Sequence, residues 1–539
     1  MLHDANLKLF SPASPHYERA AETSAEIMAR YKAAFDAARI APARWNVGGQ
    51  ISPAYGMPKF KSFKDGYDDS PPARQAGGYD DPPARQAGAR AEPGCHRGVA
   101  GKSKAGPGLR THFAMPGPFI NRGPSPKLKM RPIAAGHSDP MRGSKNACAR
   151  AIMFMLERCE QRGTVDNLRM VSCTALTGTI RAGNQQLRNA NNFPANSDGT
   201  AVDVSKLRLK LVVHDVAQLY TSLPHDVVRE ALAWLTSTYK KTVRQKHAFI
   251  AVPIRGRQAK SQIHGGRSQN EATATTWSLE SITALVDLSL EFSYLQLGVD
   301  HPLRQTVGIA MGCPASGALA LTALAFVEHS SYQKIPAAMR PRLFGLRIMD
   351  DLARAVVYLV DDAQTEAEAD RLLQATKYHD SLILEQTSDP AQHFTRYLEG
   401  ELFVHEGRSL DCRFFNPNVV RLNPGVDSGA VSLSYELRCE KLRFRSWSSY
   451  GPPSVKRQVI YGFFRRMHGY GLDLERTQTE AGTQLVIELL HYNYPVQFLR
   501  SLIEQATDET ICPLSKCSLL SLRELVEPTT TRRPCATPW

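Results

Sequence analysis

The chain has 539 residues and a formal net charge of +14, because 66 Lys and Arg residues stand against 52 Asp and Glu. This length exceeds that of one small domain and is sufficient for two to four connected subdomains. The basic balance favours a polyanionic partner, although a solvated basic surface would give the same count. Ten cysteines without regular spacing argue against a disulfide framework and indicate a reducing, intracellular compartment.

No targeting signal is visible, because no apolar segment precedes Pro12 and because Glu18, Glu22 and Glu26 have the wrong charge for an organelle transit peptide. The uncharged run at 307–327 is long enough to cross a bilayer, but Gly308, Gly312 and Pro314 interrupt it. We therefore predict a buried loop followed by a helix at this place, and no membrane partner.

The N-terminal part alternates between helical and low-complexity sequence. Hydrophobic spacing predicts a polar helix over 16–40 and a second helix over 144–162. Between them, residues 66–88 contain a repeat, GYDDSPPARQAG followed by GYDDPPARQAG. Because such Gly-, Ala-, Arg- and Pro-rich sequence buries little apolar surface, we predict a disordered insertion over 62–126.

A polar segment reaches about residue 205, and strand-like sequence begins after it. Apolar and polar residues then alternate over 207–213 and predict a strand that ends at Asp215, and an amphipathic helix is expected after Pro224. Two short apolar runs, 343–348 and 352–357, predict a tight hairpin with acids at its turn. Beyond residue 430 the chain becomes basic with interleaved aromatic residues, a composition that could grip a duplex.

Three acids stand out, namely Asp215 at the end of the predicted strand and the pair Asp350 and Asp351 at the hairpin turn. Buried carboxylates of like charge repel, and a divalent cation would relieve that cost. Carboxylate oxygens suit Mg²⁺, and two such ions can stabilise both oxygens of an in-line phosphoryl displacement. Spacing alone leaves a solvated turn as an equal alternative.

Asp-Asp dipeptides also occur at 68–69, 80–81 and 361–362. The first two follow Tyr and imitate a polymerase Tyr-Asp-Asp string, but they lie in the repeat and precede Pro-Pro. They lack the apolar flanks of a buried hairpin, so we expect no metal at these pairs.

The order of three segments carries a family resemblance. These are VVHDVAQLYTSLPHD at 212–226, QTVGIAMGCPASGALALTALA at 305–325 and FGLRIMDDLARAVVY at 344–358. They resemble the palm motifs of reverse transcriptases, and most closely those of Penelope-like element reverse transcriptases. By this resemblance Asp215, Asp350 and Asp351 are the catalytic metal ligands for two Mg²⁺ ions, with Mn²⁺ as the alternative.

The same resemblance implies the nucleotide-binding residues. Tyr220 stands where the family keeps an aromatic gate against the ribose 2′-hydroxyl. AYGMPKFK at 54–61 and KMRPIAAG at 129–136 look like two fingers segments, which makes Lys59 and Arg131 the expected triphosphate contacts. Gly312 matches a turn that lets the backbone approach template or nucleotide closely.

The fold implied is a right-hand polymerase of the α+β class, with an antiparallel-sheet palm and a helical thumb. The segment RYLEGELFVHEGRSLDCRFF at 396–415 resembles the family's segment at the junction of palm and thumb. The expected divisions are a helical lead-in (1–49), fingers (50–200) with the insertion at 62–126, a palm (201–430) that includes part of the fingers at about 243–300, a helical thumb (431–510) and a tail (511–539).

The implied activity is RNA-directed DNA synthesis that extends a DNA 3′ end, encoded by a retroelement. Its partners would be an RNA template, a DNA primer and dNTPs, in the nucleus, and nothing predicts the oligomeric state. Ile348 stands where the family usually has a Tyr before the Asp pair. The string LRIMDD is similar to the corresponding segment of telomerase catalytic subunits. We identify no GIY-YIG endonuclease, so nicking is not expected. An RNA-dependent RNA polymerase, a telomerase-like enzyme and an inactive nucleic-acid-binding remnant stay open as alternatives.

Overall fold

The computed structural model describes 16–58, 130–134, 136–189, 193, 202–243, 249–254, 262–298, 302–375, 378–389, 394–398, 400–416, 418–422, 434–437, 444, 446–449, 452–467 and 474–506. The chain divides into two units, residues 1–60 with 130–539 and residues 61–129. The predicted insertion at 62–126 and Lys59 lie outside the described residues. All that follows concerns the first unit.

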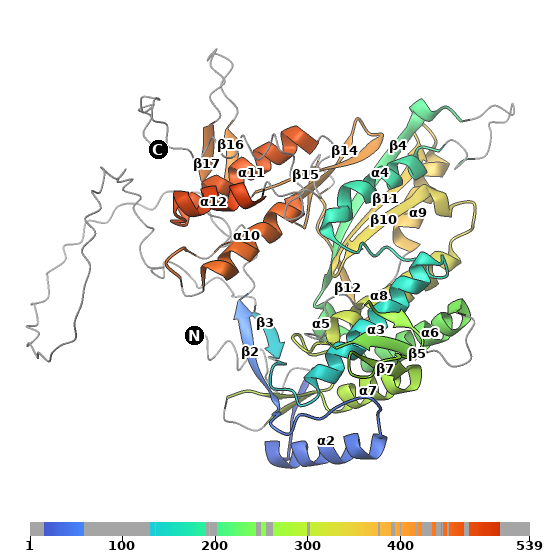
Figure 1. Ribbon diagram of the computed structural model, residues 1–539. Coiled ribbons are helices and arrows are strands. Elements are labelled where there is room, and N and C mark those ends of the chain that lie inside the picture. Colours follow the sequence, from blue (N-terminus) through green and yellow to red (C-terminus); the bar gives the residue numbers. More distant parts are fainter. Residues whose placement is uncertain are drawn as a thin grey trace, which may run out of the picture. The chain divides into compact units, whose positions relative to one another are not determined.

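A four-stranded antiparallel sheet carries the three acids. Its strand order is β10 (Leu343–Ile348), β11 (Asp351–Leu359), β4 (Leu207–Ala217) and β12 (Ile383–Gln386) (Figure 1). Strand β4 continues two residues beyond the predicted end at Asp215, because β12 pairs with it there and aligns Ile383 with Ala217. The alternation of apolar and polar residues thus predicted the strand, while its end depends on a partner that is distant in sequence.

Helices cover one face of this sheet. Val216 and Leu352 belong to a core cluster built with residues of α3 (Arg142–Gln161), α6 (His225–Val243), α7 (Leu279–Glu291) and α8 (Ser316–Lys334). Helix α9 (Ala363–Ala375) packs on β11 over the same face. The predicted helix after Pro224 is confirmed, and its apolar side is buried as its spacing indicates.

The opposite face packs against C-terminal elements. Val213 and Ala353 share a core cluster with residues of β13 (Phe394–Tyr397), β14 (Gly400–His405), β15 (Ser409–Phe414) and three helices, α10 (Pro453–Met467), α11 (Leu474–His491) and α12 (Val496–Ala506). Strands β13 to β15 form a three-stranded antiparallel sheet, and β16 (Val419–Leu422) pairs with β17 (Ser434–Leu437). Three helices therefore follow the sheets, while strand β17 lies inside the range 431–510 that was predicted as a helical thumb.

The N-terminal segment joins a five-stranded sheet of order β1 (Tyr17–Arg19), β9 (Leu303–Gln305), β8 (Tyr294–Gln296), β2 (Ser52–Pro58) and β3 (Met130–Ala134). The helix predicted over 16–40 is therefore wrong at its start, because β1 pairs with β9 and α2 spans only Ser24–Ala38. Thr23 and Glu26 form a reciprocal capping box that fixes this start.

The segment described as polar before residue 205 contains a helix that was not predicted, α4 (Leu176–Leu187). Its sequence includes two glycines, which weaken the helical signal. One of them, Gly183, faces β10 so closely that an added Cβ would lie 2.5 Å from the Phe344 ring. Helix α4 is thus stabilised by packing on the sheet, which no local pattern indicates.

Smaller elements complete the described residues. Strand β5 pairs with β6 and β7 in a three-stranded sheet. Their bounds, with those of the short helices, are β5 (Phe249–Pro253), β6 (His264–Gly265), β7 (Ala274–Ser278), α5 (Leu219–Ser222), η1 (Cys173–Ala175), η3 (Val204–Lys206) and η4 (Arg340–Arg342). Within the described ranges, no helix is both long and apolar enough to span a membrane. The mixture of helices and antiparallel sheets confirms the α+β class, and the division into fingers, palm and thumb stays a prediction.

Candidate catalytic site

Two of the three predicted acids are direct neighbours across the sheet. Asp351 on β11 is the Cα partner of Asp215 on β4, and residues directly opposite on antiparallel strands place their side chains on the same face. Asp215 is only 6% exposed. The backbone N–H of Val216 donates to the Asp350 carbonyl at 2.8 Å, so the turn is held against β4.

The predicted hairpin is confirmed, and its turn consists of Met349 and Asp350 between the paired residues Ile348 and Asp351. Met349 has φ +52°, an uncommon conformation for a non-glycine residue. Its carbonyl accepts a hydrogen bond of 3.2 Å from Arg347 Nη1. The Tyr397 hydroxyl donates to the Asp351 carbonyl at 3.4 Å, which ties β13 to the base of the turn.

A buried ion pair supports the turn from behind. Arg347 is fully buried, and its Nε and Nη2 donate to the two carboxylate oxygens of Glu328 on α8 at 2.5 and 3.0 Å. The Tyr378 hydroxyl donates to the same carboxylate at 2.5 Å. Burial opposes the charge of Arg347, but the Glu328 carboxylate raises the pKa of Arg347 overall. This pair links the helix of the middle motif to the Asp350 turn, and sequence reasoning missed it.

Tyr220 lies beside this turn. After β4 the chain turns at Gln218, which has φ +52°, and enters the short helix α5 that carries Tyr220. Burial, and then the charge of Asp350, raise the pKa of Tyr220 to about 12. The Tyr220 carbonyl accepts from Ile309 N at 2.6 Å, so the loop of the middle motif is joined to α5. Tyr220 and Asp350 are therefore close enough to interact electrostatically.

Gly312 lies where the middle motif meets β3. Its φ is +114°, and an added Cβ would lie 2.0 Å from the Ala134 carbonyl oxygen. Ala134 N donates to the Met311 carbonyl at 2.7 Å. The same strand contains Arg131, which aligns with Met57 of β2. The backbone of the predicted fingers segment thus docks on the glycine loop.

Gly312→Ala is expected to lower the free energy of unfolding by about 1–3 kcal/mol through backbone strain alone. The clash with Ala134 adds to this cost, and chemical denaturation measures both together. The control is Gly178→Ala, because Gly178 is exposed in α4 with open space around its Cβ. Alanine there is expected to raise stability by up to about 1 kcal/mol. Equal unfolding free energies for the two variants would contradict the assignment of Gly312.

A fourth carboxylate joins the row of acids. Glu385 on β12 is the Cα partner of Asp215 on its other side, so Glu385, Asp215 and Asp351 share one face of the sheet. Glu385 is exposed, and only the register of β12 could have identified it.

Among the described residues, no group of three or more His, Cys, Asp or Glu is arranged to hold a metal ion. Mg²⁺ often uses only one or two carboxylates besides substrate phosphates, and neighbouring carboxylates such as Asp215 and Asp351 suit that coordination.

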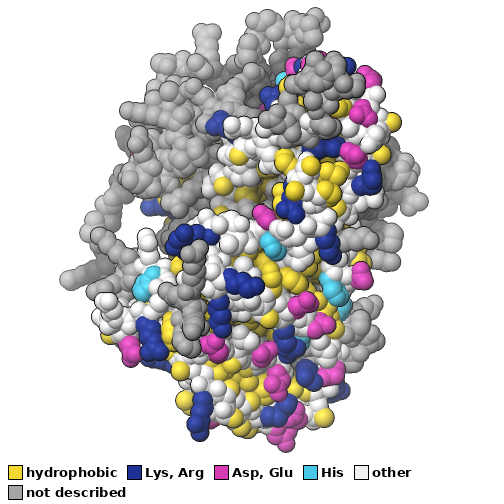
Figure 2. Space-filling model, turned by 90° about the vertical axis from the view of Figure 1, so that its right-hand side faces the viewer, with side chains coloured by type: hydrophobic (Ala, Val, Ile, Leu, Met, Phe, Trp, Pro, Cys, Tyr) yellow, Lys and Arg dark blue, Asp and Glu magenta, His cyan; other side chains and the backbone are white. Residues whose placement is uncertain are grey.

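Two aromatic residues of the basic segment beyond residue 430 are buried, so the prediction that this segment's aromatic side chains contact a duplex is wrong for them. Phe463 and Phe464 on α10 are 4% and 1% exposed, because they belong to the core that joins the C-terminal helices to the sheet. Lys456 is also engaged internally, since its Nζ donates to the Ser449 carbonyl at 2.9 Å and lies 4.9 Å from the Trp447 ring centre. On the face that Figure 2 shows, basic and acidic side chains are interspersed.

Comparison with known proteins gives structural likeness only. No protein-family model and no curated protein matches the sequence. Telomerase from Candida albicans bound to a fragment of telomeric RNA matches with a TM-score of 0.42 and 10% identity, over 74% of this chain and 61% of that chain. Apo telomerase from Candida tropicalis gives 0.37 and 11%, over 74% and 63%. The BmCPV RNA-dependent RNA polymerase at elongation state gives 0.28 and 12%, over 51% and 20%.

This chain thus spans about three fifths of the length of those two telomerase chains. At such low TM-scores these likenesses do not decide an activity.

Proposed function

We propose that this protein is an RNA-directed DNA polymerase that extends a DNA 3′ end by two-metal-ion nucleotidyl transfer. The observation that supports this most is the register of Asp351 with Asp215 on one face of the sheet, with Asp350 in the adjoining turn. Asp215 and Asp351 are the two carboxylates that the register makes neighbours, and carboxylate oxygens are the ligands that hard divalent cations prefer. The source would be a retroelement of the Penelope-like class.

Asp215, Asp350 and Asp351 would hold two Mg²⁺ ions, with Mn²⁺ as a substitute. Bound there, the ions would stabilise the attacking and leaving oxygens of an in-line displacement. The protein itself would position the reactants. Burial of Asp215 and the backbone contacts of the hairpin keep the carboxylates in place before substrate arrives.

The nucleotide would bind between Tyr220 and the segment of β3 that docks on Gly312. The Tyr220 hydroxyl is neutral near pH 7, and burial, followed by the charge of Asp350, raises its pKa further, to about 12. A half-buried neutral ring beside the acids suits a steric gate against the ribose 2′-hydroxyl. Arg131, and Lys59 outside the described residues, would contact the triphosphate.

Primer extension tests the proposal directly. The full chain, an RNA template, a DNA primer and Mg²⁺ are incubated with dNTPs and, separately, with NTPs. Template-directed incorporation of dNTPs in preference to NTPs is expected. Preference for NTPs would instead support an RNA polymerase. No incorporation with any pair of primer and template would support an inactive nucleic-acid-binding remnant.

Tyr220→Ala is expected to lower the preference for dNTPs over NTPs by about 10–100-fold, because a hydrophobic pocket discriminates by roughly that factor per small group. The control is Tyr220→Phe, which keeps the ring and is expected to keep the preference. The measurement is the ratio of kcat/KM for dNTP and NTP in primer extension, which is insensitive to a general loss of activity. An unchanged ratio for Tyr220→Ala would remove the gate assignment.

Two further expectations belong to the proposal. The partners are an RNA template, a DNA primer and dNTPs, and the place of action is the nucleus. A telomerase-like enzyme would differ in copying one short template repeatedly. Products that grow in a regular repeat on a defined internal template would favour that alternative.

A further inference from the structure

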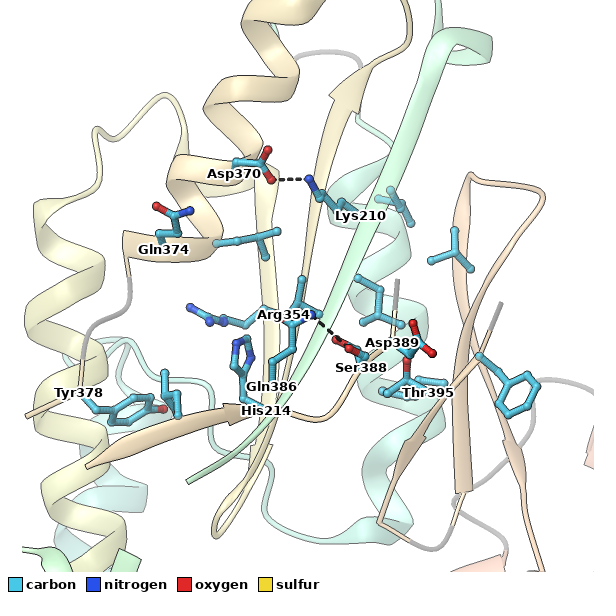
Figure 3. A pocket seen from close by; sticks show the side chains of 18 of the residues that line it. Lys210, His214, Arg354, Asp370, Gln374, Tyr378, Gln386, Ser388, Asp389 and Thr395 are labelled. Carbon is cyan, nitrogen blue, oxygen red and sulfur yellow. Dashed lines mark hydrogen bonds and ion pairs between the residues drawn. The ribbon is translucent and has the colours of Figure 1, made fainter. Parts of the chain in front are cut away.

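A cavity of about 960 Å³ borders the central sheet away from the row of acids. Its polar lining includes Lys210 and His214 of β4 and Arg354 of β11 (Figure 3). These residues alternate with Asp215 and Asp351 along their strands, so their side chains lie on the opposite face of the sheet. Helix α9, the segment 378–389 and strands β13 and β14 supply the other walls. None of the proposed catalytic residues lines this cavity.

Arg354 is the unusual member of the lining. It is only 3% exposed, and its Nε and Nη1 have no hydrogen-bond partner among the described residues. Glu328 attracts Arg354 electrostatically, but its carboxylate oxygens accept hydrogen bonds from Arg347 and Tyr378. Asp370 pairs with Lys210. Buried donors of a charged group that lack hydrogen-bond partners are costly.

A second arginine on the same face makes the contrast clear. Arg347, at 0% exposure, is held by both carboxylate oxygens of Glu328. The two arginines share burial and fold context, yet only one has a carboxylate bound to it. Arg354 therefore provides donors for a group that the described part of the chain does not supply.

The lining of the cavity has mixed charge. Besides Arg354 and the paired Lys210 and Asp370, it contains the carboxylates of Asp380 and Asp389. Burial lowers the pKa of Arg354, while Tyr378 and Glu328 act in the opposite direction. Ser388 and Thr395 add hydroxyl groups to the lining, and Phe394 adds an aromatic ring.

We propose that this cavity binds an organic anion, with Arg354 holding a phosphate or carboxylate group of the ligand. A guanidinium matches both groups through paired N–H donors. The volume is that of a site for a small organic molecule and exceeds what an inorganic ion needs. This site is independent of the proposed polymerase reaction.

Thermal unfolding of the full chain with EDTA tests the proposal at constant ionic strength. The probes are adenosine 5′-monophosphate, citrate and inorganic phosphate, with chloride as the reference anion. A ligand that binds only the folded state raises Tm in a saturable way. We expect such a rise with adenosine 5′-monophosphate or with citrate, and the better of the two identifies the phosphate or the carboxylate class.

The decisive variant is Arg354→Met. It removes an unpaired buried charge, so without anion its Tm is expected to equal or exceed that of the wild type. Its response to all three probes is expected to be lost. Arg354→Lys keeps the charge without the paired donors and is expected to bind the best probe about tenfold more weakly. Lys240→Met, an exposed change of the same charge on α6, is expected to respond as the wild type does.

Two results would overturn the site. One is a wild-type Tm that shows no saturable response to any of the three probes. The other is an Arg354→Met protein that responds as strongly as the wild type. If Arg354→Met does not fold, calorimetric titration of Arg354→Lys decides, and an affinity equal to that of the wild type overturns the assignment.

Discussion

Asp350→Asn is expected to lower nucleotide incorporation by about a thousandfold, equivalent to about 4 kcal/mol of transition-state stabilisation. The substitution keeps the size of the side chain and removes a charge from the turn that adjoins Asp215 and Asp351. Single-turnover primer extension with Mg²⁺ measures the rate. Binding of the primer–template duplex is measured in parallel and is expected to change little.

The chain offers a matched control for this experiment. Asp361 belongs to a second Asp pair, it is exposed just after β11, and its φ of +68° is one that Asn also tolerates. Asp361→Asn removes the same charge from a turn that faces solvent, and its rate is expected to equal that of the wild type. If Asp350→Asn incorporates nucleotides as fast as Asp361→Asn, the metal assignment fails.

Glu328→Ala is expected to lower the free energy of unfolding by about 3–5 kcal/mol, because it leaves Arg347 buried without its partner. The Tyr378 hydroxyl and the Leu168 N–H, which donate to Glu328 at 2.5 and 3.1 Å, lose their acceptor as well. Equilibrium denaturation with guanidinium chloride measures this loss. Activity is expected to fall too, since Arg347 also holds the Met349 carbonyl of the turn.

Two control variants test whether the loss of stability comes from burial of the Glu328–Arg347 pair. Glu18 pairs with Arg304 at 3.1 Å, with the side chains 52% and 44% exposed, and Glu18→Ala is expected to cost less than about 1 kcal/mol. The double variant Glu328→Met with Arg347→Met is expected to regain most of the stability, because two apolar side chains replace two buried charges. A double variant as unstable as Glu328→Ala would show that the loss does not come from an unpaired arginine.

Several features could be predicted because the signal is local. The alternation before Asp215, the apolar runs around Asp350 and the amphipathic spacing after Pro224 each depend on neighbouring residues, and the observed elements confirm them. The start of α2 was also encoded locally, in the capping box of Thr23 and Glu26, but the prediction overlooked it. Local signals fail for α4, because its two glycines weaken the helical pattern and the close fit of Gly183 against Phe344 of β10 is not encoded locally.

The sequence by itself determined the strand that contains Asp215 and the hairpin that has Asp350 in its turn. The tertiary structure decided their register, and a shift by one residue would turn Asp351 to the face opposite Asp215. It also decided that Arg347 meets Glu328, whereas Arg354 lines a cavity without a bonding partner for its Nε and Nη1. The pairing of buried charges depends on side chains that meet only when α8 packs on the sheet. No periodicity along the chain encodes that contact.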